Sequence, residues 1–468
     1  MDDEQERGLR NWLRSLFTGW QRPTEHPVDS RGEGAESLIG FVIAAGLVGV
    51  LTGLSAASFR LLLEQAARLR HSLAAWAHGS WWGLVVVVLV CTLATTVAAA
   101  LVRRIEPHAE GSGIPRVEAI AEGLSQPGRF RILPIKYVGG LLAIGAGLAL
   151  GREGPSVQMG GTAATIVAVF TRRSNADLRV LVAGGAAAGL ATAFDAPIAG
   201  GVFVLEELVK RFDPRTTVAT LVASASGFAA AHLLVDSDND FQMTAPHDPR
   251  LGNAGWVVAV GIFAAVLGVL YNKAVMFGLR RADASRWPNE ARAAVIGALI
   301  GLLVWLVPNL VGSGDNLTQE ALLGHGTILA VLGVLLLRFV LGVVSYAAGT
   351  PGGLFAPMLV LGSHAGLLVA LIVKYVAPGS TVSPAAFALI GMAAFFTATV
   401  QAPVTGLILA IEMTGISNQL PPMLGACAVA MLVAIALRSK PIYDQLTERI
   451  ARNAERPETK IGQPKQAN

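Results

Sequence analysis

One carboxylate in this sequence stands between glycines in a chain that is otherwise mostly apolar. It is Glu153, in the stretch Gly151-Arg152-Glu153-Gly154-Pro155. The chain has 15% charged and 53% hydrophobic residues, whereas soluble chains carry about 25% charged residues. An ionisable side chain at membrane depth is costly and is a functional candidate by default. The chemistry open to it is the binding and release of a proton.

A second stretch, Gly353-Leu354-Phe355-Ala356-Pro357, repeats the glycine-to-proline spacing with Phe355 in place of the acid. Proline is favoured in the first turn of a helix, so both stretches predict helix starts. The first backbone N–H groups of a helix have no partner within it. Together with the helix dipole, they favour an anion.

These helix starts are predicted to lie inside the membrane, because each interrupts an apolar run. Runs 137–151 and 154–171 flank Arg152 and Glu153, and run 339–373 is broken at 349–353. With Gly111-Ser112-Gly113-Ile114-Pro115, they predict a site that surrounds one dehydrated anion without a full cationic charge. Such a site binds without trapping, which suits conduction.

The elements that position this site are predicted to be membrane helices. A bilayer span needs about 20 apolar residues. Five runs lack Asp, Glu, Lys and Arg: Ser72–Val102, Asn253–Asn272, Ala293–Gly314, Tyr375–Ile411 and Met413–Leu437. The chain is therefore predicted to be an all-α, polytopic membrane protein with one embedded domain.

The distribution of charge and the two cysteines indicate the membrane topology and argue against nucleic-acid and metal partners. The first 34 residues are polar, so no cleavable signal peptide is expected. Both end segments are basic, which by the positive-inside rule predicts cytoplasmic termini. The net charge of +4 then reflects topology, and no nucleic-acid partner is expected. Cys91 and Cys427 lie in apolar runs and form no metal or disulfide framework, and no cofactor is expected.

The two halves of the chain repeat one another. Gly111-Ser112-Gly113 recurs as Gly312-Ser313-Gly314, and the block from Gly185 to Pro197 recurs as the block from Gly391 to Pro403. Glu206 then falls on Glu412. Matched halves with Gly/Pro-interrupted segments are typical of transporters, often with inverted orientation and a substrate site between the halves.

Two other classes fit less well. An intramembrane enzyme would need a nucleophile–base pair or a metal motif, and the sequence has no His-Glu-x-x-His and no Gly-x-Ser-x-Gly. A cation channel would need rings of Asp or Glu, whereas the candidate filter presents N–H groups.

The motifs together resemble the CLC family of chloride channels and proton-coupled chloride antiporters. The resemblance runs from about Ser37 to Leu446 and rests on four motifs in order. They are Gly-Ser-Gly-Ile-Pro at 111–115, Gly-Arg-Glu-Gly-Pro at 151–155, Gly-Leu-Phe-Ala-Pro at 353–357 and Lys-Pro-Ile-Tyr at 440–443.

The resemblance implies a role for each matched position. The hydroxyls of Ser112 and Tyr443 would contact a central chloride from the cytoplasmic side. Glu153 would be the gate and external proton site, whose carboxylate competes with chloride for the outer position. Glu207 would be the internal proton site. The chloride-binding set would be Ser112, Gly113, Ile114, Gly154, Leu354, Phe355, Ala356 and Tyr443.

The expected function is proton/chloride exchange, and the alternative is a passive voltage- or pH-gated chloride channel. A channel would need the same filter but no internal proton donor, so Glu207 discriminates between them. Glu207 could instead be a surface acid near Lys210 and Arg211. Glu206 pairs with Glu412 in the repeat and is expected to be structural. As adjacent residues, Glu206 and Glu207 cannot share a helix face. Asp195 departs from the family pattern, in which an amide is more usual.

The resemblance also implies an organisation. We expect a cytoplasmic N-terminal segment at 1–36, a transmembrane domain at 37–446 and a cytoplasmic tail at 447–468. The halves would be about 37–235 and 253–446, inverted relative to each other, with broken helices meeting at the anion site. The family implies a homodimer with one pore per subunit in a bacterial inner membrane, and no cytoplasmic nucleotide-binding domains are expected.

Overall fold

The computed structural model describes residues 35–235 and 240–455, and the regular structure in these ranges is helical. Nearly all of the predicted N-terminal segment and the end of the tail, from 456 onward, lie outside the described residues. The α-helices are α2 (Ala35–His78), α3 (Gly83–Arg104), α4 (Ile114–Ala121), α5 (Ile132–Gly145), α6 (Glu153–Phe170), α7 (Asn175–Phe194), α8 (Pro197–Phe203), α9 (Pro214–Ala231), α10 (Ala254–Ala284), α11 (Asn289–Leu306), α12 (Asp315–Leu322), α13 (Ile328–Tyr346), α14 (Phe355–Val376), α15 (Pro384–Val400), α16 (Pro403–Thr414), α17 (Leu420–Ala436) and α18 (Ile442–Glu455). Short 3₁₀ turns lie at η1 (Pro107–Ala109), η3 (Leu251–Asn253) and η4 (Pro308–Leu310), and a π-helix lies at η2 (Val204–Leu208).

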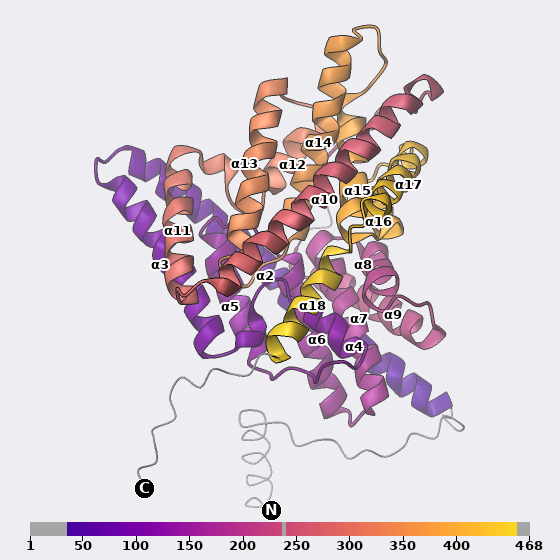
Figure 1. The fold of residues 1–468 in the computed structure, drawn as a ribbon. Coiled ribbons are helices and arrows are strands. Elements are labelled where there is room, and N and C mark those ends of the chain that lie inside the picture. The colour runs from indigo at the N-terminus through magenta and orange to yellow at the C-terminus, as the bar shows by residue number, and fades with distance from the viewer. Residues whose placement is uncertain (1–34, 236–239, 456–468) are drawn as a thin grey trace, which may run out of the picture.

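Seven of the described helices are long and apolar enough to cross a membrane. The longest are α2 with 44 residues and α10 with 31, well beyond the roughly 20 that a perpendicular span needs. Excess length of this kind is accommodated by tilt, and α10 runs obliquely across the molecule in Figure 1. The chain is thus a multi-pass membrane protein.

The helices form an inner and an outer set. Most side chains of α6, α7, α14 and α15 are buried within the protein. In α3, α11 and α13 only about a third of the residues in the apolar window are buried, so their apolar surface faces lipid. The inner set carries both glycine-to-proline stretches.

Glycines allow the inner helices to pack in the same way in both halves. A Cβ at Gly160 in α6 would collide with the carbonyl oxygen of Gly185 in α7. A Cβ at Gly362 in α14 would approach the carbonyl oxygen of Gly391 in α15 to 2.9 Å. Close backbone approach through small residues is how membrane helices pack in the absence of a hydrophobic driving force. The repeat predicted from sequence is therefore a repeat of packing.

A reciprocal pair of caps joins the halves. Glu206 accepts hydrogen bonds at the start of α16 from the backbone N–H of Val404 (3.0 Å) and of Thr405 (2.7 Å), and from the Thr405 hydroxyl (2.7 Å). Glu412 accepts at the start of α8 from the N–H groups of Ile198 (3.0 Å) and Ala199 (2.6 Å). Each acid thus accepts from backbone N–H groups at a helix start of the other half, which have no partner within their own helix. This confirms the structural role expected of Glu206.

Breaks between helices interrupt the charge-free runs. The charge-free run Ser72–Val102 contains a turn between α2 and α3, and Tyr375–Ile411 contains two breaks, at 377–383 and at 401–402. The absence of charged residues describes only the composition of a run. It does not distinguish a continuous helix from helices joined by an apolar turn. In addition, α18 runs from Ile442 to Glu455, across the expected boundary at 446, which stays a prediction.

Candidate anion site

Among the described helices, several interior starts lack a side-chain cap, and three of them bear on the predicted site. They are α4 at Ile114, α6 at Glu153 and α14 at Phe355. By contrast, the Ser174 side chain caps α7 and the Asp213 side chain caps α9. The first N–H groups of an uncapped helix remain available to a ligand. The helix starts at 153 and 355 agree with the sequence prediction.

Backbone hydrogen bonds hold these starts together. Gly151 and Gly353 exchange two N–H···O bonds, both 2.8 Å long. Gly111 donates to the Thr350 carbonyl at 3.2 Å and accepts from the Gly352 N–H at 3.0 Å. The loops that precede α4, α6 and α14 therefore cross at one place, although they are far apart in the sequence.

A buried lysine fixes the loop that carries Ser112. The Lys136 ammonium on α5 donates to the carbonyls of Ala109 (3.1 Å) and Gly111 (2.6 Å). The backbone N–H of Ser112 lies 3.3 Å from the Tyr346 hydroxyl, to which it donates. Gly113 then turns into α4 with a φ of +84°, a conformation that favours glycine. The loop is held by its backbone, which leaves the Ser112 side chain uncommitted.

Among the buried oxygens that have no hydrogen-bond partner within the described part of the chain are Ser112 Oγ, Tyr443 Oη and Glu153 Oε2. These residues are at most 2% exposed. An unsatisfied buried polar atom costs about 1–3 kcal/mol and calls for a structural or functional reason. Two hydroxyl donors beside open helix N-termini are suited to an anion.

The glycines bring Ser112 and Glu153 close to the helix starts. A Cβ at Gly154 would collide with the Ser112 hydroxyl, and a Cβ at Gly151 would collide with the Glu153 carboxylate. The same carboxylate lies against the backbone N–H of Ala356 at the start of α14. The structure therefore brings the predicted residues of both stretches to one location, with the acid seated on helix N–H groups.

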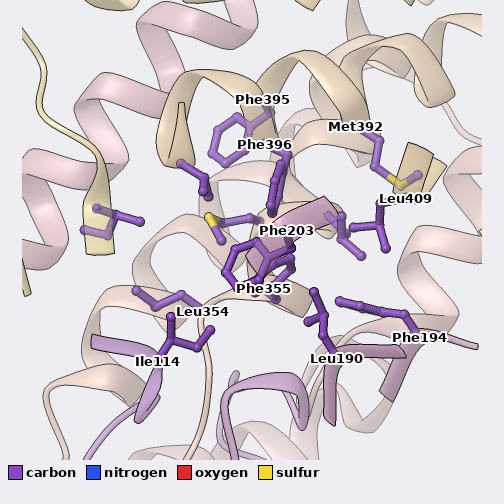
Figure 2. Packing of buried hydrophobic residues seen from close by; sticks show 14 of the residues in the cluster. Ile114, Leu190, Phe194, Phe203, Leu354, Phe355, Met392, Phe395, Phe396 and Leu409 are labelled. Atoms are coloured by element: carbon purple, nitrogen blue, oxygen red, sulfur yellow. The ribbon is translucent and has the colours of Figure 1, made fainter. Parts of the chain in front are cut away.

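Aromatic rings surround the start of α14. Figure 2 shows Phe355 packed with Phe203 and Phe396, among Leu354, Ile114 and other buried apolar side chains. The Phe355 ring centroid lies 4.8 Å from that of Phe396, 5.4 Å from that of Phe203 and 6.1 Å from that of Tyr443. Tyr443 is the second residue of α18 and is fully buried. These rings keep water from the site and orient the tyrosine hydroxyl.

Glu207 lies in the π-helix η2, between α8 and α9. It is 4% exposed and its Oε1 has no partner within the described residues. The alternative of a surface acid is therefore wrong. Arg211 pairs with Asp213 at 3.6 Å, whereas Lys210 is the cation whose charge acts on Glu207. Glu207 and Glu153 both act electrostatically on the Tyr443 hydroxyl. π-helices are rare and often mark functional sites.

A cavity of about 430 Å³ adjoins Arg152, the neighbour of Glu153. Arg152 faces Asp240 at 3.5 Å and Asp315 at 3.6 Å, and Asp240 also pairs with Arg60 at 2.8 Å. Sequence reasoning missed both acids. Asp315 had a detectable signal, because it directly follows Gly312-Ser313-Gly314, the repeat of the Ser112 loop.

Asp195 ends α7 in the left-handed conformation, with a φ of +53°. Its repeat partner, Gln401, ends α15 with a φ of +64°. Asp tolerates this region better than most residues. Its carboxylate lies 3.3 Å from His232 Nε2.

A model of the family described as "voltage gated chloride channel" matches residues 94–435. The chain belongs to this family, the CLC family. It is 36% identical over 424 residues to a protein of Vibrio cholerae named H(+)/Cl(-) exchange transporter ClcA, covering 87% of this chain and 89% of the relative. The protein of that name in Vibrio parahaemolyticus is 34% identical over 91% of this chain and 92% of its own length.

Solved structures of the family show the same fold. The structure described as a slow cyanobacterial Cl⁻/H⁺ antiporter superposes with a TM-score of 0.85 at 32% identity, covering 89% of this chain and 99% of that chain. A eukaryotic CLC transporter superposes with a TM-score of 0.75 at 22% identity, covering 89% of this chain and 75% of that chain, and shows the fold alone. These names describe transporters and none describes an enzyme. The all-α inverted-repeat fold expected from the sequence is confirmed.

Proposed function

We propose that this protein exchanges chloride for protons across the membrane. The observation that carries the proposal is the meeting of two unpartnered hydroxyls and a buried carboxylate at the uncapped starts of α4, α6 and α14. Chloride leaves water at a cost that preorganised dipoles and donors can offset. The relatives named as H(+)/Cl(-) exchange transporters support the same conclusion.

The chloride sites follow from the donors at these starts. Ser112 Oγ and Tyr443 Oη would donate to a central chloride, together with the N–H groups of Leu354 and Phe355. An outer chloride would use the N–H groups near Gly154 and Ala356, against which the Glu153 carboxylate now lies. Gly113 and Ile114 would complete the loop around the central ion.

Glu153 would act as the gate and external proton site. When ionised, its carboxylate occupies the place of the outer anion. Protonation removes the charge, so the side chain no longer competes for the helix N–H groups and chloride can enter. Proton and chloride thus exclude each other at one carboxylate, and this competition couples their movements.

Glu207 would act as the internal proton site. Its burial and its unpartnered oxygen support the role, since an ionisable side chain kept inside a membrane protein is costly without a function. Protons would reach Glu153 from Glu207 past Tyr443, whose hydroxyl both acids influence.

The test is flux from liposomes that contain the purified protein. An imposed chloride gradient should drive protons uphill, as read by a pH electrode, while a chloride electrode records the anion and potassium does not move. Chloride flux without any proton movement would establish a passive channel. Potassium flux of similar size would overturn the anion site itself.

Replacement of Glu207 separates the two ion routes. Glu207→Gln should abolish chloride-driven proton movement and leave chloride flux measurable, because the anion donors do not include this residue. Glu206→Gln is the matched control on the adjacent residue, since that acid is committed to the start of α16. Proton movement that survives in Glu207→Gln would place the proton route elsewhere.

We also propose cytoplasmic termini and a homodimer with one pore per subunit. Basic residues near both ends support the topology. Exposed apolar side chains on α8, α16 and α17, among them Ile198, Val404 and Leu424, would support the dimer. The mass of the purified protein in detergent measures the second point.

A further inference from the structure

A lysine outside the anion site links α18, which carries the Tyr443 hydroxyl, with α4, the helix that follows the Ser112 loop. Lys210 Nζ donates to Asp444 Oδ1 at 2.5 Å and to Glu118 Oε1 at 3.3 Å. Asp444 directly follows Tyr443 on α18. Glu118 lies on α4, which begins two residues after Ser112. Figure 1 shows α4 and α18 side by side, and a hydrogen bond joins them directly.

The direct hydrogen bond between α18 and α4 comes from the Thr447 hydroxyl, which donates to Glu118 Oε2 at 2.9 Å. Glu118 is 4% exposed, whereas the side chains of Lys210 and Asp444 are 40% and 33% exposed. Partly buried charges are screened less by salt than surface charges. The cluster is therefore a stronger contact than a solvated ion pair, yet one that water can reach.

The backbone of Lys210 has an unusual conformation. Its φ is +55°, in the left-handed region that is unfavourable for a residue other than glycine. Such strain persists only where the surroundings over-determine it. Here the preceding π-helix and the contacts of the ammonium with Asp444 and Glu118 do so.

Carboxylates outnumber the single cation around the Lys210 ammonium. Three carboxylates act on it, those of Asp444, Glu118 and Glu207, while Glu206 is bonded to the start of α16. Burial lowers the pKa of Lys210, but the hydrogen bond to Asp444 and the charges of Glu118 and Glu207 outweigh burial and raise it above the usual range. The ammonium thus bonds two acids, Asp444 and Glu118, and lies in the electrostatic field of a third, Glu207, the proposed proton site.

We propose that Lys210 is a positioning residue that holds α4 against α18 and so closes the side of the anion site formed by Ser112 and Tyr443. With Glu207 neutral, the ammonium serves Asp444 and Glu118 alone and the contact is tightest. With Glu207 ionised, the ammonium is shared three ways and the contact loosens. Proton occupancy of Glu207 thereby controls passage of chloride between the two helices. The inference rests on the proposed function.

The experiment measures chloride flux and the number of protons moved per chloride in liposomes. Lys210→Gln should raise chloride flux by up to about tenfold, the factor that corresponds to loss of one charge-assisted hydrogen bond, and should lower the proton-to-chloride ratio. Lys210→Arg should restore both quantities. Arg211→Gln is the matched control, because it removes the same charge one residue away, from a pair with Asp213.

Asp444→Asn provides a second variant that keeps the size of the side chain. If the residues act through one contact, the effects of Lys210→Gln and Asp444→Asn on the ratio should be non-additive in the double variant. A ratio and flux unchanged in Lys210→Gln, or effects that add, would overturn the inference. A wild-type protein that moves chloride without protons would instead refute exchange, and the flux comparison of Lys210→Gln with Arg211→Gln would still decide the role of the lysine.

Discussion

The loops before α4 and α12 are built alike, yet only one leaves its serine hydroxyl free. Lys136 holds the first loop by two backbone carbonyls. Arg338 holds the second by the carbonyls of Gly312 (2.7 Å) and Ser313 (2.6 Å). Ser112 Oγ has no partner within the described residues, whereas Ser313 Oγ donates to Asp315 at 3.0 Å.

The helix starts differ in the same sense. The first half places Glu153 at the start of α6, and the second half places Phe355 at the start of α14. The two halves thus share one backbone arrangement, and a few side chains decide which half holds the titratable group and the free hydroxyl. In the first half, the loop has a free hydroxyl on Ser112 and the helix start has the titratable Glu153. In the second half, the hydroxyl of Ser313 is bonded to Asp315 and the helix start has the ring of Phe355.

The largest effect is expected when Glu153, the titratable group that distinguishes the first half from the second, is replaced. Glu153→Ala leaves neither helix start with a titratable group. Proton movement driven by a chloride gradient should fall to the level of protein-free liposomes, while chloride flux persists and loses its steep pH dependence. A Glu153→Ala protein that still pumps protons would show that the carboxylate is not the gate.

Tyr443 tests how much of the site depends on the hydroxyl and how much on the ring. Tyr443→Ala removes the donor and the contact with Phe355, so chloride affinity should fall by about tenfold or more, with looser proton coupling. Tyr443→Phe keeps the ring and should be milder. Calorimetric titration with chloride measures the affinity, and an unchanged value in Tyr443→Ala would argue against direct contact.

The two serines sharpen the comparison directly. Ser112→Ala should weaken chloride binding by about tenfold, the value of one hydrogen bond to a charged group. Ser313→Ala is its counterpart in the second half and should change affinity by less than about twofold, because its hydroxyl is bonded to Asp315. Equal effects in the same titration would mean that both loops bind the ion.

The smallest effects are expected at the reciprocal caps, where the halves are most alike. Glu206→Gln and Glu412→Gln should each lower the free energy of unfolding by about 1–3 kcal/mol. The loss of stability should be larger in Glu206→Gln, because Glu206 accepts three hydrogen bonds whereas Glu412 accepts two. Thermal unfolding in detergent measures this, with exposed Glu122→Gln as the control. A larger loss in Glu412→Gln would reverse the ranking.

Sequence predicted the features that local chemistry dictates. Glycine-to-proline spacing located the starts of α6 and α14, and the repeat identified Glu206 as structural before its partners were seen. Adjacency on a helix predicted that Glu206 and Glu207 would face different ways, and Glu206 alone bonds α16.

Other features depend on contacts between distant segments. The burial of Glu207 depends on a π-helix, for which no local pattern exists. Lys210 meets Asp444 from the far end of the chain, and its spacing in the sequence contains no trace of that contact. The position of the turn between α2 and α3 cannot be derived from charge, because Ser72–Val102 is free of charged residues throughout.

The four backbone hydrogen bonds where the loops cross restrict how this protein can move. Many transporters expose their substrate to alternate sides by rocking one repeat against the other. Here such rocking would separate Gly151 from Gly353 and Gly111 from Thr350 and Gly352, stranding backbone groups at a depth where no water replaces their partners. These bonds therefore join the two repeats at the place where the three helix starts meet, and they favour side-chain rotation and small helix displacements over rocking of one repeat against the other.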